Sequence, residues 1–366
     1  MTILIFLAVL FVLILVHEWG HYIVAKLTGM RVDEFAIGFP PRLLSWKKGE
    51  TVYSLNALPI GGFVRIYGED ATQVTKDGGS PDKDRAFSAR PKWAQALVLI
   101  AGVTMNWIFA WFLLVIIIMM GVPTGITEDK ATENSVLYVD SVIAGSPAEN
   151  ALPPQSKIIS VSSGDEKLAQ LLPSTFSDFV AGSKEEPLLI VYADKTGQEH
   201  AVPIVPKVGV IESSPDRAAL GVSLSLVETI KQPFVPALKE ATIQTYTITK
   251  AIVTGLYGLM AGALAGTADF SQVSGPIGIV GYVGDAAAVG FTSLLFFTAI
   301  ISMNLAVINL LPIPALDGGR LIFVAIETIT RREIPPVWAG RVNLVGFALL
   351  LLLMIAATTN DVMKLW

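Results

Sequence analysis

Four stretches of this chain are apolar over enough length, about 20 residues, to cross a lipid bilayer. They occupy residues 3–27, 93–121, 292–311 and 339–357. A segment in the bilayer core must satisfy its backbone hydrogen bonds internally, so each stretch is predicted to be a helix. The chain is 52% hydrophobic and only 16% charged. Soluble domains are about one quarter charged, so composition also indicates a multi-pass membrane protein.

The regions between these stretches predict smaller folded parts. Turn-forming residues at 58–62 separate two strand-like runs, which predicts a β-hairpin at about 51–67. Short apolar runs alternating with Gly, Ser and Pro predict a β-rich domain at 128–225. Residues 233–266 mix charged residues with Thr and Gly, which favours an amphipathic helix at the membrane interface over a fifth span.

The predicted fold class is therefore a membrane α-helical core of four spans with two inserted parts. In chain order, the predicted segments are a first span at 1–27, a hairpin-containing region at 28–92, a second span at 93–121, a β-rich domain at 128–225, an interfacial helix at 233–266, a third span at 292–318 and a fourth span at 336–358.

The distribution of basic residues predicts how the spans are oriented. Lys and Arg concentrate in the loop 28–92 and in the loop after the third span, so both loops should be cytoplasmic. Both termini and the β-rich domain would then lie outside the cytoplasm, with the chain in the cell (inner) membrane.

The net charge of −5 gives no basic surface for nucleic acid. The absence of cysteine excludes disulfides and thiolate metal ligands.

A compact polar motif interrupts the first span. His17 and His21 are four residues apart, so on a helix they share one face and can bind one metal ion together. Glu18 lies beside them, where it can accept a proton from a metal-bound water. Ionisable groups inside a membrane helix are costly and usually functional. The motif therefore predicts a single Zn²⁺ site with Glu18 as general base.

Two histidines leave this zinc one protein ligand short. His200, the remaining histidine, falls in the predicted extracytoplasmic domain and is a poor candidate. Asp317 is a better one, because the prolines and glycines around it break the helix where backbone must line a cavity. The alternative is that Asp317 caps the following helix.

Taken together, these motifs resemble the site-2 protease family of intramembrane zinc metalloproteases. The resemblance rests on His17-Glu18-Trp19-Gly20-His21 in the first span, Leu316-Asp317-Gly318 late in the third, the hairpin sequence at 58–64 and the segment at 274–279. The β-rich insert resembles a PDZ domain, with Ala144–Ala148 in a familiar turn. The match covers nearly the whole chain and is nearest to bacterial regulator of sigma-E proteases, in a form with one PDZ domain.

The resemblance implies roles for individual residues. His17, His21 and Asp317 would hold the zinc, and Glu18 would act as base and then as proton donor to the leaving amine. Asn309 would bind substrate or stabilise the oxyanion, although an interhelical hydrogen bond would also explain it. Asn106 matches a further family position, where packing is an equally good explanation.

The implied substrates are single-pass membrane proteins or leftover signal peptides, such as an anti-sigma factor after a first extracytoplasmic cut. A transmembrane helix must unwind before hydrolysis, and pairing with an exposed hairpin edge would help it do so. The predicted substrate-binding residues of the hairpin are Asn56, Leu58, Ile60, Gly61 and Gly62. The PDZ-like domain would bind substrates or exclude those with bulky outer domains.

Two other functions use the same features. A membrane metal carrier also places ligands in membrane helices, but it needs no base beside the two histidines, and the inverted repeats of many transporters are missing. An inactive scaffold that recruits partners through its PDZ domain would not need the intact set of His, Glu and Asp.

Overall fold

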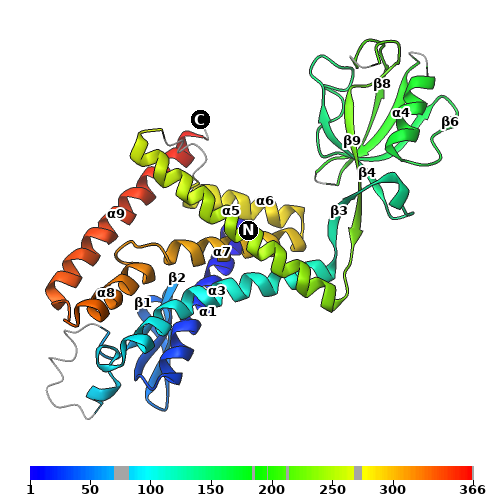
Figure 1. Cartoon of the computed structure of the whole chain (residues 1–366). Helices are drawn as coiled ribbons and strands as arrows, with labels where there is room; N and C mark the ends of the chain where they lie inside the picture. Colours follow the sequence, from blue (N-terminus) through cyan, green and yellow to red (C-terminus); the bar gives the residue numbers. More distant parts are fainter. Residues whose placement is uncertain (70–81, 184–185, 196, 212–213, 268–273, 365–366) are drawn as a thin grey trace. The chain divides into compact units, whose positions relative to one another are not determined.

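A computed structural model describes residues 1–69, 82–183, 186–195, 197–211, 214–267 and 274–364. The chain forms two compact units, shown in Figure 1. The membrane unit comprises residues 1–116 and 238–366, and the β-rich unit comprises residues 117–237.

Among the described residues, four helices are long and apolar enough to cross a membrane, which confirms the predicted multi-pass core. They are α1 (Thr2–Leu27), α3 (Lys92–Met120), α7 (Phe291–Asn309) and α9 (Pro336–Met363). Within the predicted third span, 292–318, the helix breaks near the prolines, as their position in the sequence suggests. The helix α7 ends at Asn309, and an irregular segment with two prolines precedes the next helix, because proline cannot donate the helical hydrogen bond.

Three other helices complete the membrane unit: α5 (Phe234–Ala265), α6 (Pro276–Val289) and α8 (Asp317–Thr330). The helix α5 presents threonine hydroxyls to α3, where Trp107 and Trp111 donate their indole N–H groups to Thr249 and Thr242. The helix α6 packs against α1 and α9. At its first turn, both carboxylate oxygens of Asp361 accept backbone N–H groups, from Gly275 and Gly278.

The region after α1 forms a more elaborate sheet than one hairpin. Its two long strands are β1 (Val32–Lys48) and β2 (Thr51–Ile66). Residues 34–37 of β1 pair with residues 52–55 on one side and with residues 62–65 on the other. Residues 42–48 also pair with 51–56. The order of segments across the sheet is therefore 42–48, 51–56, 34–37 and 62–66. The outer segments are therefore 42–48 and 62–66, whereas residues 52–55 lie inside the sheet.

The turn between β1 and β2 is attached to the end of α1. Glu50 accepts from Lys26 in the last turn of α1 and from two nitrogens of Arg85, at 2.7 and 2.8 Å. The hydrogen bonds from Arg85 lower the pKa of the Glu50 carboxyl to about 2. This ionic cluster fixes the sheet relative to the helix that carries the histidines.

The β-rich unit contains one antiparallel sheet in the order β3-β9-β4-β5-β7-β8, with β6 paired to β5. Its strands are β3 (Val122–Ile126), β4 (Val136–Val142), β5 (Lys157–Ser163), β6 (Glu166–Lys167), β7 (Leu188–Ala193), β8 (Glu199–Ile204) and β9 (Val222–Ile230). The helix α4 (Pro173–Gly182) buries Phe176 and Val180 in the core. A small sheet capped by one helix is the architecture expected for the PDZ-like insert, although β9 runs to Ile230, beyond the predicted end at 225.

Candidate metal centre

The two histidines of the motif project from one face of α1. Their ring centroids are 4.7 Å apart, as expected for residues four apart on a helix. Trp19, between them in sequence, is about half exposed on another face. Gly20 packs so closely on α3 that a Cβ atom there would lie 2.8 Å from the Ala101 carbonyl carbon. The glycine of the motif therefore allows α1 and α3 to approach each other.

Asp317 reaches the histidines from the first turn of α8. The segment before it is turned by Ala315, which has a positive φ of 75°. Gly318 and Gly319 contact the backbone carbonyl groups of that segment so closely that no side chain would fit. The N-cap of α8 is Leu316, which makes no side-chain capping bond, so helix capping does not explain Asp317.

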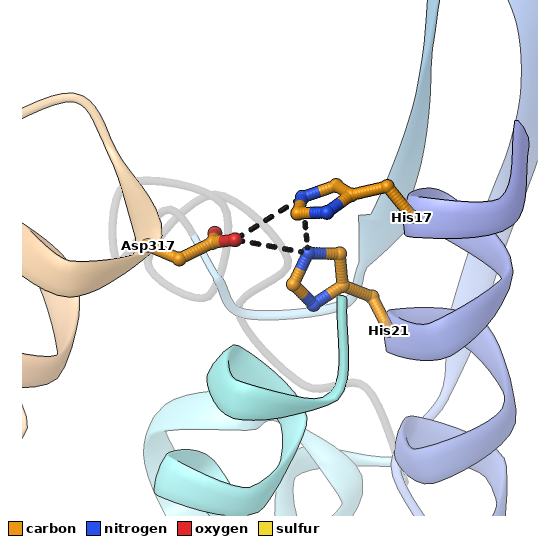
Figure 2. A group of neighbouring side chains, drawn as sticks. All are labelled: His17, His21 and Asp317. Atoms are coloured by element: carbon orange, nitrogen blue, oxygen red, sulfur yellow. Dashed lines mark hydrogen bonds and ion pairs between the residues drawn. The ribbon is translucent and has the colours of Figure 1, made fainter. Parts of the chain in front are cut away.

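The three side chains converge on one point (Figure 2). The Nε2 atoms of His17 and His21 are 3.1 Å apart, and they lie 3.1 and 3.4 Å from Asp317 Oδ2. Zinc bonds of about 2.0–2.1 Å place neighbouring ligands of a tetrahedral site about 3.3 Å apart. The three distances therefore match three ligands around one zinc ion.

The hydrogen bonding at Asp317 supports the same conclusion. Its Oδ2 atom is buried and receives no hydrogen bond from the described residues, despite the two nearby imidazoles. A buried carboxylate oxygen without a donor is costly unless a cation satisfies it. Two imidazoles and one carboxylate suit zinc, and three protein ligands are typical of catalytic rather than structural zinc sites.

One face of helix α3, at positions 98, 102 and 106, contacts the imidazoles of His17 and His21. His21 donates its Nδ1–H to the Val98 carbonyl oxygen at 2.7 Å. The carboxamide of Asn106 lies 3.4 Å from His17 Nδ1. Between them, a Cβ atom at Gly102 would lie 2.7 Å from His17 Cε1 and would also collide with His21. From the sequence, Asn106 was a match to a family position for which packing was an equally good explanation, and Val98 was missed because it acts through its backbone.

Glu18 faces the sheet. Its Oε2 atom accepts the backbone N–H of Val64 at 2.9 Å. A small cavity beside it is lined by Leu15, Gly61 and Gly62, among others. Glu18 therefore lies at the outer segment 62–66 of β2. Val64 was not singled out from sequence, because its contribution is a backbone N–H.

The hairpin residues predicted to bind substrate are in different environments. Leu58 is 49% exposed. Gly61 has a φ of 126°, and Gly62 lies near Glu18. The side chain of Ile60 lies outside the described part of the chain. Asn56, by contrast, is buried and donates to the Gly38 carbonyl within the sheet, so it has no surface to offer a substrate.

Two further predicted positions are placed by the fold. Asn309 is the last residue of α7 and is half-buried, eight residues before Asp317. His200 lies in β8 of the other unit, where its Nε2 is 2.9 Å from Asp194. The metal cluster found among the described residues contains His17, His21 and Asp317 and does not include His200.

Curated relatives match this chain over its whole length. A Clostridium perfringens protein provisionally named a zinc metalloprotease is 36% identical over 96% of this chain and 95% of its own length. The zinc metalloprotease RasP of Oceanobacillus iheyensis is 28% identical over 100% of this chain and 99% of its own. The regulator of sigma-W protease RasP of Bacillus subtilis is 28% identical with the same coverage.

Among solved structures, the PDZ domain of an SdrC-like protein from Listeria monocytogenes is 22% identical, covers 26% of this chain and 92% of its own, and has a TM-score of 0.21. The model of peptidase family M50 matches residues 5–353. With a match of this extent and a ligand set that suits zinc, the chain belongs to peptidase family M50.

Proposed function

We propose that this intramembrane zinc metalloprotease cuts other membrane proteins within or near their transmembrane segments. The observation that carries the proposal is the convergence of His17, His21 and Asp317 from two helices of an apolar core. The substrates would be single-pass proteins already shortened by an extracytoplasmic cut, such as an anti-sigma factor, or leftover signal peptides.

The residues of the site would have separate roles in binding the metal, transferring a proton and stabilising the developing negative charge. His17, His21 and Asp317 would hold the zinc, which when bound supplies a Lewis acid that activates water and offsets developing negative charge. Glu18 would take a proton at Oε1 or Oε2 and later return it to the leaving amine nitrogen. Asn309, at the end of α7, would donate its amide N–H to the oxygen on which charge develops.

The position of Glu18 supports a route for the substrate. An extended substrate segment could pair with the outer segment 62–66 of β2, whose Val64 N–H points at Glu18. Pairing there would place the unwound peptide beside the base and would satisfy backbone groups that the bilayer cannot. Gly61 and Gly62 would let the substrate backbone come close, and the exposed Leu58 would contact its side chains.

The test of the mechanism is Glu18→Gln, which keeps the size of the side chain but removes the base. We expect one zinc per chain, as in the unmodified protein, and a loss of peptide hydrolysis of at least about 10²-fold. Zinc is measured by elemental analysis, and cleavage is measured on a single-pass substrate in proteoliposomes. His17→Ala is the matched control, because it should lose both zinc and activity. Cleavage by the Glu18→Gln protein at the normal rate would refute the assigned role.

A further inference from the structure

Both zinc-binding histidines present their second ring nitrogen to α3. His21 Nδ1 meets the Val98 carbonyl oxygen at 2.7 Å, and His17 Nδ1 meets the Asn106 carboxamide at 3.4 Å. Positions 98 and 106 are two helical turns apart on α3, so one helix face contacts both rings. This arrangement matters because the two nitrogens of a neutral imidazole have different roles.

An imidazole that binds zinc through Nε2 carries its proton on Nδ1, and that proton needs an acceptor. For His21 the acceptor is the Val98 carbonyl, which leaves Nε2 free to face Asp317. For His17 the neighbouring group must also be an acceptor. A donor at that position would take the Nδ1 lone pair and force the proton onto Nε2, the atom 3.1 Å from Asp317 and from His21 Nε2.

Asn106 can supply that acceptor. The oxygen and nitrogen of a side-chain amide exchange places when the carboxamide rotates, and the hydrogen-bond network decides which is correct. With Nδ2 toward His17, the Oδ1 atom of Asn106 is buried and has no donor among the described residues. With Oδ1 toward His17, that oxygen receives the Nδ1–H of the imidazole.

We propose that Asn106 is a positioning residue for the zinc site, which accepts the Nδ1–H of His17 through Oδ1 and so holds Nε2 toward the metal. The inference rests on the proposed zinc chemistry of the site. Asn106 is fully buried, so water cannot substitute for it. The backbone carbonyl of Asn106, and not its side chain, accepts the Ser302 hydroxyl of α7 at 2.7 Å.

A packing role and an acceptor role for Asn106 predict opposite orders for the effects of two substitutions, Asn106→Leu and Asn106→Asp. If the side chain only fills space between α1, α3 and α7, Asn106→Leu should be tolerated and Asn106→Asp, which buries a charge, should be worse. If the side chain accepts the Nδ1–H of His17, Asn106→Asp keeps the acceptor and Asn106→Leu removes it. The two variants therefore separate the alternatives by their rank order.

The experiment measures metal binding without proteolysis. Each variant is made in the full-length protein with Glu18→Gln, and its zinc affinity is measured by competition with a chelator. We expect Asn106→Leu to weaken zinc binding about 10- to 100-fold, as losses of such hydrogen-bond partners do, and Asn106→Asp to stay within about threefold of the parent. The visible spectrum of the Co²⁺-loaded protein should change for Asn106→Leu and not for Asn106→Asp.

Ser302→Ala is the matched control, because it removes a buried hydrogen bond of Asn106 without touching its side chain. It should leave zinc affinity unchanged, and thermal unfolding of the metal-free proteins checks folding. Asn106→Ala gives the same readout if leucine does not fit. Wild-type affinity in the variants that lack the acceptor would overturn the inference. Failure of the parent protein to bind zinc would instead overturn the proposed function.

Discussion

At the residue scale, the site depends as much on a missing side chain as on the ligands. Gly102 lies between Val98 and Asn106 on the face of α3 that supports both histidines. Any Cβ atom there would lie 2.7 Å from His17 Cε1 and would overlap His21, closer than real Cβ contacts permit. The imidazoles can occupy this space only because position 102 is glycine.

We therefore expect Gly102→Ala to displace at least one imidazole and to lower bound zinc to well under one per chain. Elemental analysis of the purified protein in detergent measures this loss. Gly255→Ala on α5 is the matched control, because its Cβ would meet nothing within 4 Å. It should retain zinc and activity. Full zinc occupancy in Gly102→Ala would mean that α1 and α3 can separate without cost.

At the element scale, the sheet of β1 and β2 places one strand edge next to Glu18. Residues 52–55 have partners on both sides, so residues 51–66 cannot bind a substrate along their whole length. The outer segment 62–66, with Val64 against Glu18, is the part that strand addition could use. The exposed Leu58 lies in β2 just before this segment, where it pairs with Phe39.

Leu58→Pro tests this element. Proline removes a backbone N–H and restricts φ within β2, just before the outer segment, so we expect cleavage of a transmembrane substrate to fall at least about tenfold while zinc stays bound. Leu58→Ala keeps the N–H and removes only the apolar side chain. If the hairpin merely rests on the bilayer, the alanine variant should be impaired at least as much as the proline variant. Unchanged cleavage by Leu58→Pro would exclude strand addition at this edge.

At the scale of the whole molecule, the orientation of the spans decides which compartment reaches the site. Basic residues favour a cytoplasmic location for the region 28–92 and an extracytoplasmic one for the β-rich unit. Because the chain has no cysteine, a single introduced cysteine reports its own location. In intact cells, an impermeant maleimide should label Glu166→Cys and should label Lys48→Cys only after permeabilisation. The reverse pattern would invert the proposed topology.

The β-rich unit would then act as a filter outside the membrane. In it, β3 pairs with β9, with Ile126 opposite Leu226. Excising residues 128–221 should preserve that pairing and join the two ends of the deletion. We expect the shortened enzyme to cleave substrates that still carry their outer domains, which the full-length enzyme rejects. Immunoblotting for both substrate forms measures this, and equal rejection by both enzymes would argue against a filter.

Local features of the sequence predict the spans, the pair of histidines and Asp317 as a third candidate ligand. Hydrophobicity over a bilayer thickness is a local property, and a spacing of four residues places His17 and His21 together on any helix. Asp317 could be found because prolines and glycines interrupt an apolar segment, a signal that is also local. The same prolines follow the end of α7 at Asn309, two residues before the end of the apolar stretch 292–311.

The groups that surround these three side chains follow from long-range packing and could not be read from the sequence. Two of these groups are backbone atoms, the Val98 carbonyl and the Val64 N–H, and a third feature is the lack of a side chain at Gly102. No pattern of side chains in the sequence indicates any of them. Asn56 was expected to bind substrate because nothing local shows that its side chain is buried and bonded to the Gly38 carbonyl within the sheet. Such contacts depend on which helix and strand pack against α1, and long-range packing fixes that choice.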